Sequence, residues 1–154
     1  MSEFTVRFES ETGGLSSTNP SSLSYSTQKS LPQSHRVLLV DDDPKTIQLL
    51  RSILENYPDI EVVGEAMDGQ EAVAMASALR PEVIVMDIAL PYLDGIEATH
   101  RIKKALPRTV VIGLAGTFST PMYNAIRTAG AAAFMCKNQL LAIHETILFS
   151  LSQR

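Results

Sequence analysis

The sequence predicts an α/β fold in which five parallel strands alternate with helices. From His35 onward, apolar runs of strand length alternate with amphipathic stretches of helix length, and this alternation is typical of parallel strands joined by crossover helices. Residues 83–86, with the sequence VIVM, are apolar at every position, as expected for a central strand that helices cover on both faces. The strand and helix units follow one another without any other internal repeat.

Capping and turn residues set the limits of the predicted elements. Asp43 suits the N-cap of the first helix because Pro44 can occupy the first helical position. Gly130 suits the C-terminal end of the fourth helix. The other predicted N-caps are Asp68, Thr120 and Asn138. The predicted strands are residues 37–41, 61–65, 83–86, 110–114 and 132–136, and the predicted helices are residues 44–57, 69–79, 95–105, 121–129 and a last helix that follows Asn138.

Length and composition narrow the class of protein. The 154 residues, 45% of them apolar, suffice for one domain with its own core. The net charge of -4 argues against direct nucleic-acid binding, which needs a basic surface. Cys136 is the only cysteine, so we expect a reducing compartment. The sequence has no signal peptide and no apolar run of roughly 18 residues, so we expect a cytoplasmic protein that does not contact a membrane.

The first 34 residues differ in composition from the rest. They are rich in Ser, Thr and Gly, and such a segment buries too little apolar surface to offset the entropy of ordering it. Phe4, Val6 and Phe8 alternate with polar residues, which would suit a short strand. Despite this short alternation, the composition leads us to expect a disordered arm over residues 1–34 and a globular domain over residues 35–154.

Acidic residues follow two of the predicted strands. Asp41, Asp42 and Asp43 come after the first strand, Asp87 closes the third, and Lys137 follows the last. Parallel strands end at one edge of their sheet, where ligands of open α/β sheets bind. Carboxylates that meet there repel one another unless a cation lies among them. The pattern predicts a site for a metal ion and an anion, and hence phosphoryl chemistry; Asp43 is fully explained as an N-cap and is left out of the site.

These residues together resemble the receiver domain of bacterial two-component response regulators. The resemblance rests on the Asp41-Asp42 pair, Asp87, the loop LPYLDG at residues 90–95 and Lys137, and it spans residues 36–152. The segments MDI, GIEAT and AGA are similar to receivers whose output is a helix-turn-helix transcription factor. The resemblance implies a flavodoxin-like doubly wound sheet with strand order 2-1-3-4-5. No helix-turn-helix precedes the end of the chain, so we expect either a free-standing receiver or one separated from its output domain.

The resemblance also implies roles for individual residues. Asp87 would accept a phosphoryl group from a sensor histidine kinase or a phosphotransfer protein. Asp42, Asp87 and the carbonyl group of Ala89 would bind Mg2+, with Asp41 acting through water, and Lys137 would neutralise phosphoryl charge. The chain would then not be an enzyme, beyond phosphorylation and dephosphorylation of its own Asp87. The fourth helix, fifth strand and fifth helix would form a surface for homodimers or partners.

One position departs from the family pattern. Ala115 stands where receivers usually carry a Thr or Ser whose hydroxyl group binds the phosphoryl group. The loss of that hydrogen bond costs about 1.5 to 3 kcal/mol. Thr117 lies two residues later, outside the usual contact distance, and the loop amides of Gly116 and Thr117 are an alternative replacement. Phe134 matches the switch aromatic of the last strand, and with Ala115 it could stay inward. We therefore expect phosphorylation whose conformational output is weakened.

Two other functions compete with this hypothesis. A protein-binding module of the same fold would work without phosphorylation, and Ala115 favours it. A Mg2+-dependent phosphatase would use Asp87 as its nucleophile, but such enzymes usually carry a second Asp two positions later, where this chain has Ala89. Titration with a phosphate mimic and Mg2+ would separate the receiver from the phosphorylation-independent module.

Overall fold

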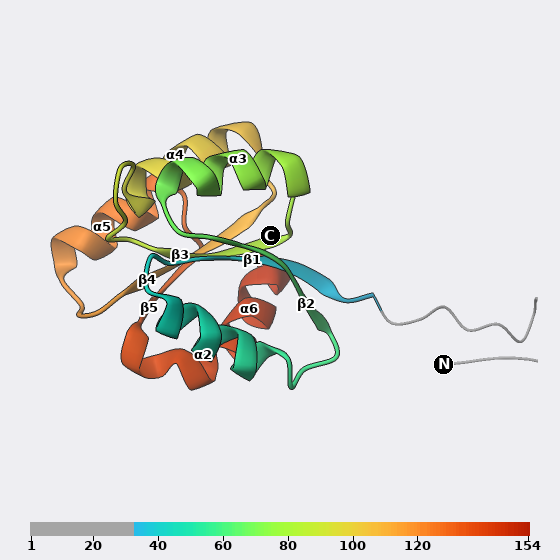
Figure 1. The fold of residues 1–154 in the computed structure, drawn as a ribbon. Helices are drawn as coiled ribbons and strands as arrows, with labels where there is room; N and C mark the ends of the chain where they lie inside the picture. Colours follow the sequence, from blue (N-terminus) through green and yellow to red (C-terminus); the bar gives the residue numbers. More distant parts are fainter. Residues whose placement is uncertain (1–32) are drawn as a thin grey trace, which may run out of the picture. The chain divides into compact units, whose positions relative to one another are not determined.

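The structure is a computed structural model that describes residues 33–154, and Ser34–Arg154 form one unit. Its five strands make one parallel sheet in the order β2-β1-β3-β4-β5 (Figure 1). This confirms the predicted fold class and strand order. The predicted arm over residues 1–34 and its short strand fall almost wholly outside the described residues. The strands are β1 (His35–Val40), β2 (Ile60–Ala66), β3 (Val83–Asp87), β4 (Val110–Ala115) and β5 (Ala133–Cys136).

Helices cover both faces of the sheet (Figure 1). One face packs against three helices and the other against two, which is the doubly wound arrangement. The first group is α3 (Gly69–Leu79), α4 (Gly95–Ala105) and α5 (Thr120–Ala129), and the second is α2 (Pro44–Leu54) and α6 (Ile143–Ser152), with the 3-10 segment η2 (Lys137–Ala142) before α6. No helix within residues 33–154 is long and apolar enough to cross a membrane.

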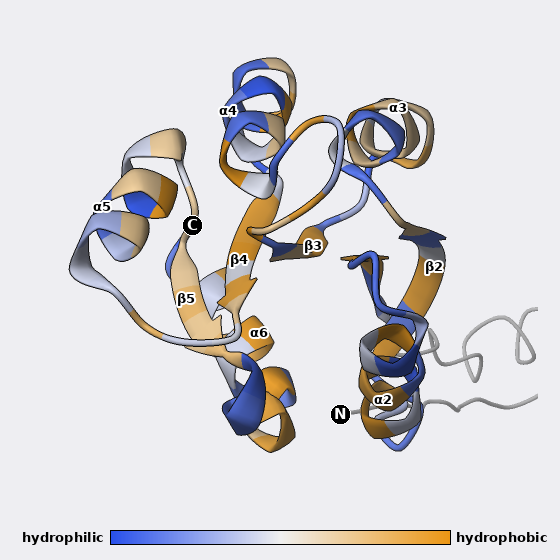
Figure 2. Ribbon diagram, turned by 60° about the vertical axis from the view of Figure 1, so that its left-hand side comes forward, coloured by the Kyte–Doolittle hydropathy of each residue, from blue (hydrophilic) through white to orange (hydrophobic). Residues whose placement is uncertain are grey.

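The central strands carry the core of the domain. In β3, Ile84 and Met86 pack on the side of α3, α4 and α5, whereas Val83 and Val85 pack on the side of α2 and α6. All five residues of β3 are buried. The strand is therefore apolar on both faces up to Asp87, in agreement with the sequence pattern, and Figure 2 shows the hydrophobic colour along β3 and β4.

Most predicted limits lie close to the observed ones. α3 and α4 have the predicted bounds, and α3 begins at its predicted N-cap, Asp68. Asp43 caps α2, accepting a hydrogen bond from the Lys45 amide at 3.1 Å. The helix ends at Leu54 rather than at residue 57, because the chain turns there with Tyr57 N–H donating to the Leu54 carbonyl group. The first strand ends at Val40, one residue before the predicted Asp41.

Two predicted N-caps are wrong. Ser119 caps α5, since its hydroxyl oxygen accepts a hydrogen bond from Met122 N–H at 3.3 Å, and Thr120 is the first helical residue. Asn138 does not begin a helix, because residues 137–142 form a 3-10 segment with a non-helical backbone at Gln139. The Gln139 side chain accepts a hydrogen bond from the Cys136 amide at 3.1 Å. The last helix accordingly begins five residues later, at Ile143.

Gly95 allows α4 to pack closely against the end of β3. A Cβ atom at Gly95 would lie 2.0 Å from the Asp87 carbonyl oxygen, a separation at which the backbone must shift. The Gly95 amide donates to the Ile88 carbonyl group at 2.9 Å. The absence of a side chain at Gly95 therefore lets the start of α4 lie directly against the backbone of Asp87, the last residue of β3.

We predict that Gly95→Ala lowers the free energy of unfolding by about 1 to 3 kcal/mol or more, because the added methyl group displaces backbone rather than a flexible side chain. Gly116→Ala is the matched control, since a Cβ atom at Gly116 would meet nothing within 4 Å. Chemical denaturation of both variants measures the difference. Equal stabilities of the two variants would contradict the close approach at Gly95.

Candidate functional site

The register of the sheet brings the acidic residues together. Val40 in β1 pairs with Met86 in β3, so the residues that follow, Asp41 and Asp87, lie side by side at the carboxyl edge. On the other side of β3, Asp87 pairs with Leu114 in β4. The sequence prediction that these strands end at one edge is confirmed in the structure.

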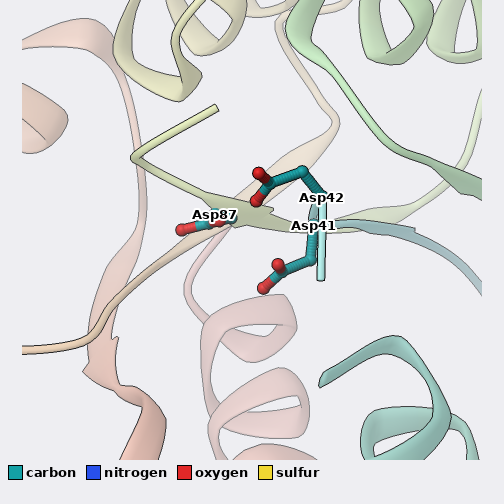
Figure 3. Close-up of side chains that lie close together, drawn as sticks. All are labelled: Asp41, Asp42 and Asp87. Carbon is teal, nitrogen blue, oxygen red and sulfur yellow. The ribbon is translucent and has the colours of Figure 1, made fainter. Parts of the chain in front are cut away.

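Three carboxylates form a cluster at this edge. Asp41, Asp42 and Asp87 each offer one oxygen, and these oxygens all lie within 4.8 Å of one another. Figure 3 shows the three side chains gathered at the carboxyl ends of β1 and β3. Asp41 is fully buried and Asp87 is 3% exposed, whereas Asp42 is exposed. The cluster thus has two carboxylates held in the protein and one that faces solvent.

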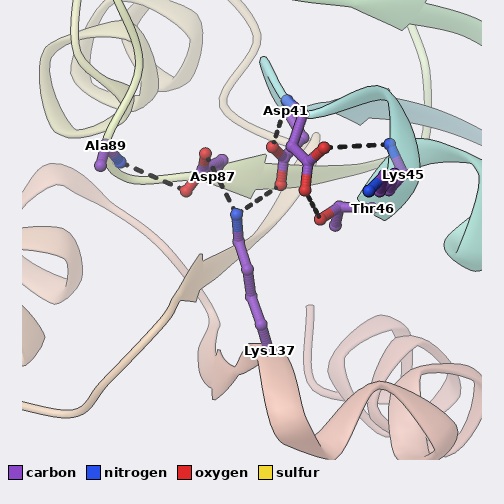
Figure 4. A network of polar contacts seen from close by, with 7 residues as sticks. Asp41, Lys45, Thr46, Asp87, Ala89 and Lys137 are labelled. Atoms are coloured by element: carbon purple, nitrogen blue, oxygen red, sulfur yellow. Dashed lines mark hydrogen bonds and ion pairs between the residues drawn. The ribbon is translucent and has the colours of Figure 1, made fainter.

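Lys137 reaches this cluster from the end of β5 (Figure 4). Its Nζ lies 2.8 Å from Asp41 Oδ2 and 3.4 Å from Asp87 Oδ2. One ammonium group therefore serves two buried carboxylates and leaves a net negative charge at the edge. This deficit of positive charge favours binding of a cation there.

Backbone groups fix the orientation of both buried carboxylates. Asp41 Oδ1 accepts a hydrogen bond from Asp43 N–H at 2.9 Å, and Asp87 Oδ1 accepts one from Ala89 N–H at 3.3 Å. The other oxygen of each side chain, Oδ2, is the one that faces Lys137. Ala89 is exposed beside Asp87, where the sequence prediction placed a carbonyl ligand.

The environment of Asp87 makes its carboxylate unusually basic. Burial, and next the neighbouring charge of Asp41, raise the pKa of Asp87 to about 6, against the opposing effect of Lys137. For Lys137, burial alone would lower the pKa, but its contacts with Asp41 and Asp87 outweigh burial and raise it. Lys137 is therefore charged at neutral pH, and Asp87 is ionised there despite its burial.

The donor set fits Mg2+, a hard cation that prefers oxygen ligands and keeps several of its waters. The cluster supplies three carboxylates and no nitrogen or sulfur donor. Asp41 Oδ2 is buried without a hydrogen bond of good geometry from residues 33–154, although Lys137 lies beside it. A buried carboxylate oxygen with unused acceptor capacity suits a metal-bound water.

Asp43 belongs to the helix and not to the cluster. Its carboxylate accepts hydrogen bonds from Lys45 N–H at 3.1 Å and from the Thr46 hydroxyl group at 3.0 Å. The hydrogen bond from Lys45 is the main cause that lowers the pKa of Asp43. The structure agrees with the assignment of Asp43 as an N-cap.

The position expected to carry a hydroxyl group is apolar. Ala115 ends β4, is 5% exposed and pairs with Cys136 in β5. Thr117, two residues later, is exposed and makes no side-chain hydrogen bond among the described residues. The site within residues 33–154 therefore presents a methyl group where a hydroxyl donor would stand.

Phe134 belongs to an aromatic group that the sequence reading missed. Its ring meets those of Phe118 and Tyr123 edge-on, at centroid separations of 5.7 and 5.9 Å. Phe118 and Tyr123 are themselves 5.9 Å apart, and the Arg127 guanidinium group lies 5.9 Å from the Tyr123 ring centroid. Two exposed aromatic residues five positions apart, flanking the start of a helix, were the available signal. The group joins the loop after β4 to β5.

The loop between β3 and α4 contains one strained residue. Tyr92 is 87% exposed and has a φ of 64°, in the left-handed region that non-glycine residues rarely occupy. Such a conformation costs roughly 1 to 2 kcal/mol. Pro91 precedes Tyr92, and the Leu93 amide donates to the Pro91 carbonyl group at 2.8 Å, so a tight turn holds Tyr92 in this conformation.

We predict that the raised pKa of Asp87 makes stability fall as pH rises. Between the ordinary carboxyl pKa of 3.8 and about 6, the folded protein keeps a proton on Asp87 that the unfolded chain has released. The free energy of unfolding should therefore drop by up to about 3 kcal/mol across this window in the absence of Mg2+. Asp87→Asn should remove the drop, whereas Asp42→Asn, at an exposed carboxylate, should retain it. Denaturation at a series of pH values tests this, and identical profiles for native protein and Asp87→Asn would refute it.

Comparisons with known proteins agree with this geometry. Residues 37–147 match the family model described as response regulator receiver domain. Over 77 residues, half of this chain, it is 51% identical to a protein-glutamate methylesterase/protein-glutamine glutaminase of Methanospirillum hungatei, covering 22% of that protein. Over 107 residues, 70% of this chain, it is 40% identical to the transcriptional regulatory protein LiaR of Bacillus subtilis, covering 51% of it.

A solved structure supports the same assignment. The signal receiver domain of the putative response regulator NarL from Mycobacterium tuberculosis superposes with a TM-score of 0.72 at 26% identity, and the match covers 80% of this chain and all of that one. The chain spans about a fifth of the first of the two relatives and half of the second. The range matched by the family model, residues 37–147, includes Asp41, Asp42, Asp87 and Lys137, and the chain belongs to the family of response regulator receiver domains.

Proposed function

We propose that this chain accepts a phosphoryl group on Asp87 from the phosphohistidine of a sensor kinase or a phosphotransfer protein. The proposal rests chiefly on the cluster in which Asp41, Asp42 and Asp87 converge while Lys137 contacts two of them. In this reaction a carboxylate oxygen of Asp87 forms the new bond to phosphorus, and the bond between phosphorus and the histidine nitrogen breaks. The product is an acyl phosphate.

Two anions must approach each other in this reaction, so their charge has to be neutralised. Asp42, Asp87 and the carbonyl group of Ala89 would hold Mg2+, with Asp41 acting through water. When bound, Mg2+ would supply positive charge that offsets the repulsion between the carboxylate and the phosphoryl oxygens. Lys137 contributes a second, permanent positive charge, since its Nζ already lies 3.4 Å from Asp87 Oδ2.

The basicity of Asp87 suits its proposed role. A carboxylate whose pKa is raised to about 6 is ionised at neutral pH and is a better nucleophile than one of ordinary pKa. Ala89 N–H holds one oxygen of Asp87. Both features are built into the residues of the chain and do not depend on the phosphoryl donor.

We also propose that Ala115 weakens the conformational output of phosphorylation. A methyl group cannot donate a hydrogen bond to a phosphoryl oxygen, so the loop after β4 has no hydroxyl link to the modified Asp87. Phe118, Tyr123 and Phe134 pack together on that loop, α5 and β5. The packing of these rings would then resist movement, and the strength of the response depends on how far the amides of Gly116 and Thr117 replace the missing hydroxyl.

A second function has one specific observation in its favour. A receiver fold that binds its partner without phosphorylation has no need of a hydroxyl at residue 115, and Ala115 satisfies this condition. The carboxylate cluster and Lys137 have no role in such a module, which is why the phosphorylated receiver is the preferred function. The phosphatase alternative lacks support because Ala89 offers no carboxylate.

We also propose a partner surface, an attached output domain and a cellular location for this domain. The faces of α5, β5 and α6 would form the dimer or partner surface, because Tyr123 of α5, Phe149 of α6 and Phe118 of the loop before α5 are exposed. The relatives are longer proteins, a transcriptional regulator and a methylesterase, so an output domain of either kind would be attached through a terminus of the domain. Residues 1–34 would act as a separate arm, and the protein would work in the cytoplasm without binding nucleic acid through this domain.

We predict that acetyl phosphate and Mg2+ add one phosphoryl group to the native protein and none to Asp87→Asn, which lacks the nucleophilic oxygen. Asp43→Asn is the matched control, because asparagine caps a helix about as well as aspartate, and it should be modified like the native protein. Intact mass measured without acid treatment detects the acyl phosphate. Phosphorylation of Asp87→Asn to the native level would contradict the assignment.

We predict that Ala115→Thr increases the structural change caused by beryllofluoride, a phosphate mimic, because the new hydroxyl group can bond the mimic. Amide shifts of the loop after β4, α5 and β5 measure the change, and Ala115→Val controls for side-chain volume. We expect the amide shift changes to be larger in the threonine variant than in the valine variant or the native protein. Equal, full changes in the native protein and the threonine variant would rule out a weakened output.

A further inference from the structure

A hollow of about 300 Å³ lies at the amino edge of the sheet, opposite the carboxylate cluster. It is formed where the chain enters β3 and β4, between the end of α3, the loop from α4 to β4 and the end of α6. Its lining includes three arginines, Arg80, Arg108 and Arg154, and a floor of buried apolar residues that includes Pro81 and Leu106. The proposed phosphoryl chemistry makes no use of this hollow.

The arginines give the hollow a positive charge on a chain whose net charge is -4. Glu82 is the one acidic residue of its lining, and Glu82 Oε1 already contacts His35 Nδ1 at 2.9 Å and Arg154 at 3.5 Å. None of the ion pairs within residues 33–154 involves the guanidinium group of Arg80 or Arg108. Two positive groups are thus available to an anion.

The floor of the hollow is apolar and buried. Pro81 is buried, Leu106 is 9% exposed and Thr109 is 6% exposed. Thr109 uses its hydroxyl group to donate to the Pro81 carbonyl group at 2.9 Å, so it presents no free donor. An apolar floor with a few charged groups at the rim is the usual composition of a small-molecule site, and about 300 Å³ is the lower end of the usual range.

Hydrogen bonds hold the walls in place without a ligand. Lys103 Nζ donates to the carbonyl groups of Pro107 and Thr109, both at 2.7 Å, and Val110 N–H donates to the Glu82 carbonyl group at 2.8 Å. Burial lowers the pKa of Lys103; its ammonium group binds the loop. A preformed site loses less conformational entropy on binding than a site that must be ordered.

We propose that this hollow binds a small organic anion, a carboxylate or phosphate group carried on a compact apolar skeleton. Arg80 and Arg108 bind the anionic group, since guanidinium groups match the geometry of both oxyanions. The skeleton lies on Pro81, Leu106 and Pro107. This proposal is independent of phosphorylation at Asp87, because the two sites lie at opposite edges of the sheet.

The test uses phthalate and phenyl phosphate as probes of the two oxyanions, with phthalamide as the neutral control. The full chain is titrated without Mg2+, so that the carboxylate cluster repels anions, and amide shifts are followed by NMR. We expect saturable shifts at Glu82, Leu106, Arg108 and Thr109 with at least one of the two anions and none with phthalamide. An absence of saturable shifts at these amides with both anions would overturn the proposal.

Variants identify the groups that bind. Arg108→Gln should weaken binding at least about tenfold, the loss expected for one charged hydrogen-bonded pair, and Arg80→Gln combined with it should weaken binding further. Arg101→Gln, at an exposed arginine of α4 outside the hollow, should leave the binding of the probe unchanged. Titration with inorganic phosphate tests whether the hollow binds an adventitious ion only. Binding of inorganic phosphate as tight as that of the better probe, or equal weakening by Arg101→Gln and Arg108→Gln, would refute an organic-anion site.

Discussion

The shared ammonium group of Lys137 is the interaction on which the carboxyl edge of this domain depends. The register of β1 and β3 puts Asp41 and Asp87 next to each other, and both side chains are almost completely buried. Two adjacent buried carboxylates are tolerated only if their charge is compensated. Lys137 compensates one of the two charges, and the protonation of Asp87 below its raised pKa of about 6 is the protein's own means of relieving the other. The proposed exchange of a metal ion and a phosphoryl group at this site would follow from this imbalance of charge.

The sequence was sufficient for the parts that repeat a strong pattern. The alternation of strands and helices predicted the order of the elements, and runs such as residues 83–86 were apolar on both faces because both faces are covered. The acids and Lys137 could be placed at one edge because parallel strands end together. The resemblance to receivers, rather than periodicity, supplied the strand order and the individual roles. The roles of Ala89, Ala115, Thr117 and Phe134 remain predictions.

Competition between similar neighbouring residues limited the prediction of where the helices begin. Ser119 and Thr120 are both good N-caps, and the sequence does not say which one the turn selects. At the end of β5, Gln139 bonds back to the Cys136 amide and interrupts the helix that Asn138 was expected to begin. The aromatic group and the arginine-lined hollow bring together residues that are distant in sequence, such as Arg80 and Arg108. Such groupings depend on tertiary packing and have no local signal.

The opposite charges of the two edges follow from the direction of the helices. Every helix of this fold starts at the carboxyl edge, where Asp43, Asp68 and Asp94 cap N-termini, and runs back to the amino edge. The positive end of each helix dipole faces the carboxyl edge and stabilises bound anions, whereas the negative end favours basic residues. Arg80, at the C-cap of α3, is explained in this way. The same rule does not explain Arg108, which lies in a loop beyond the end of α4, nor the apolar residues Pro81 and Leu106 that line the same hollow. These two features distinguish a binding site from the ordinary basic end of a helix.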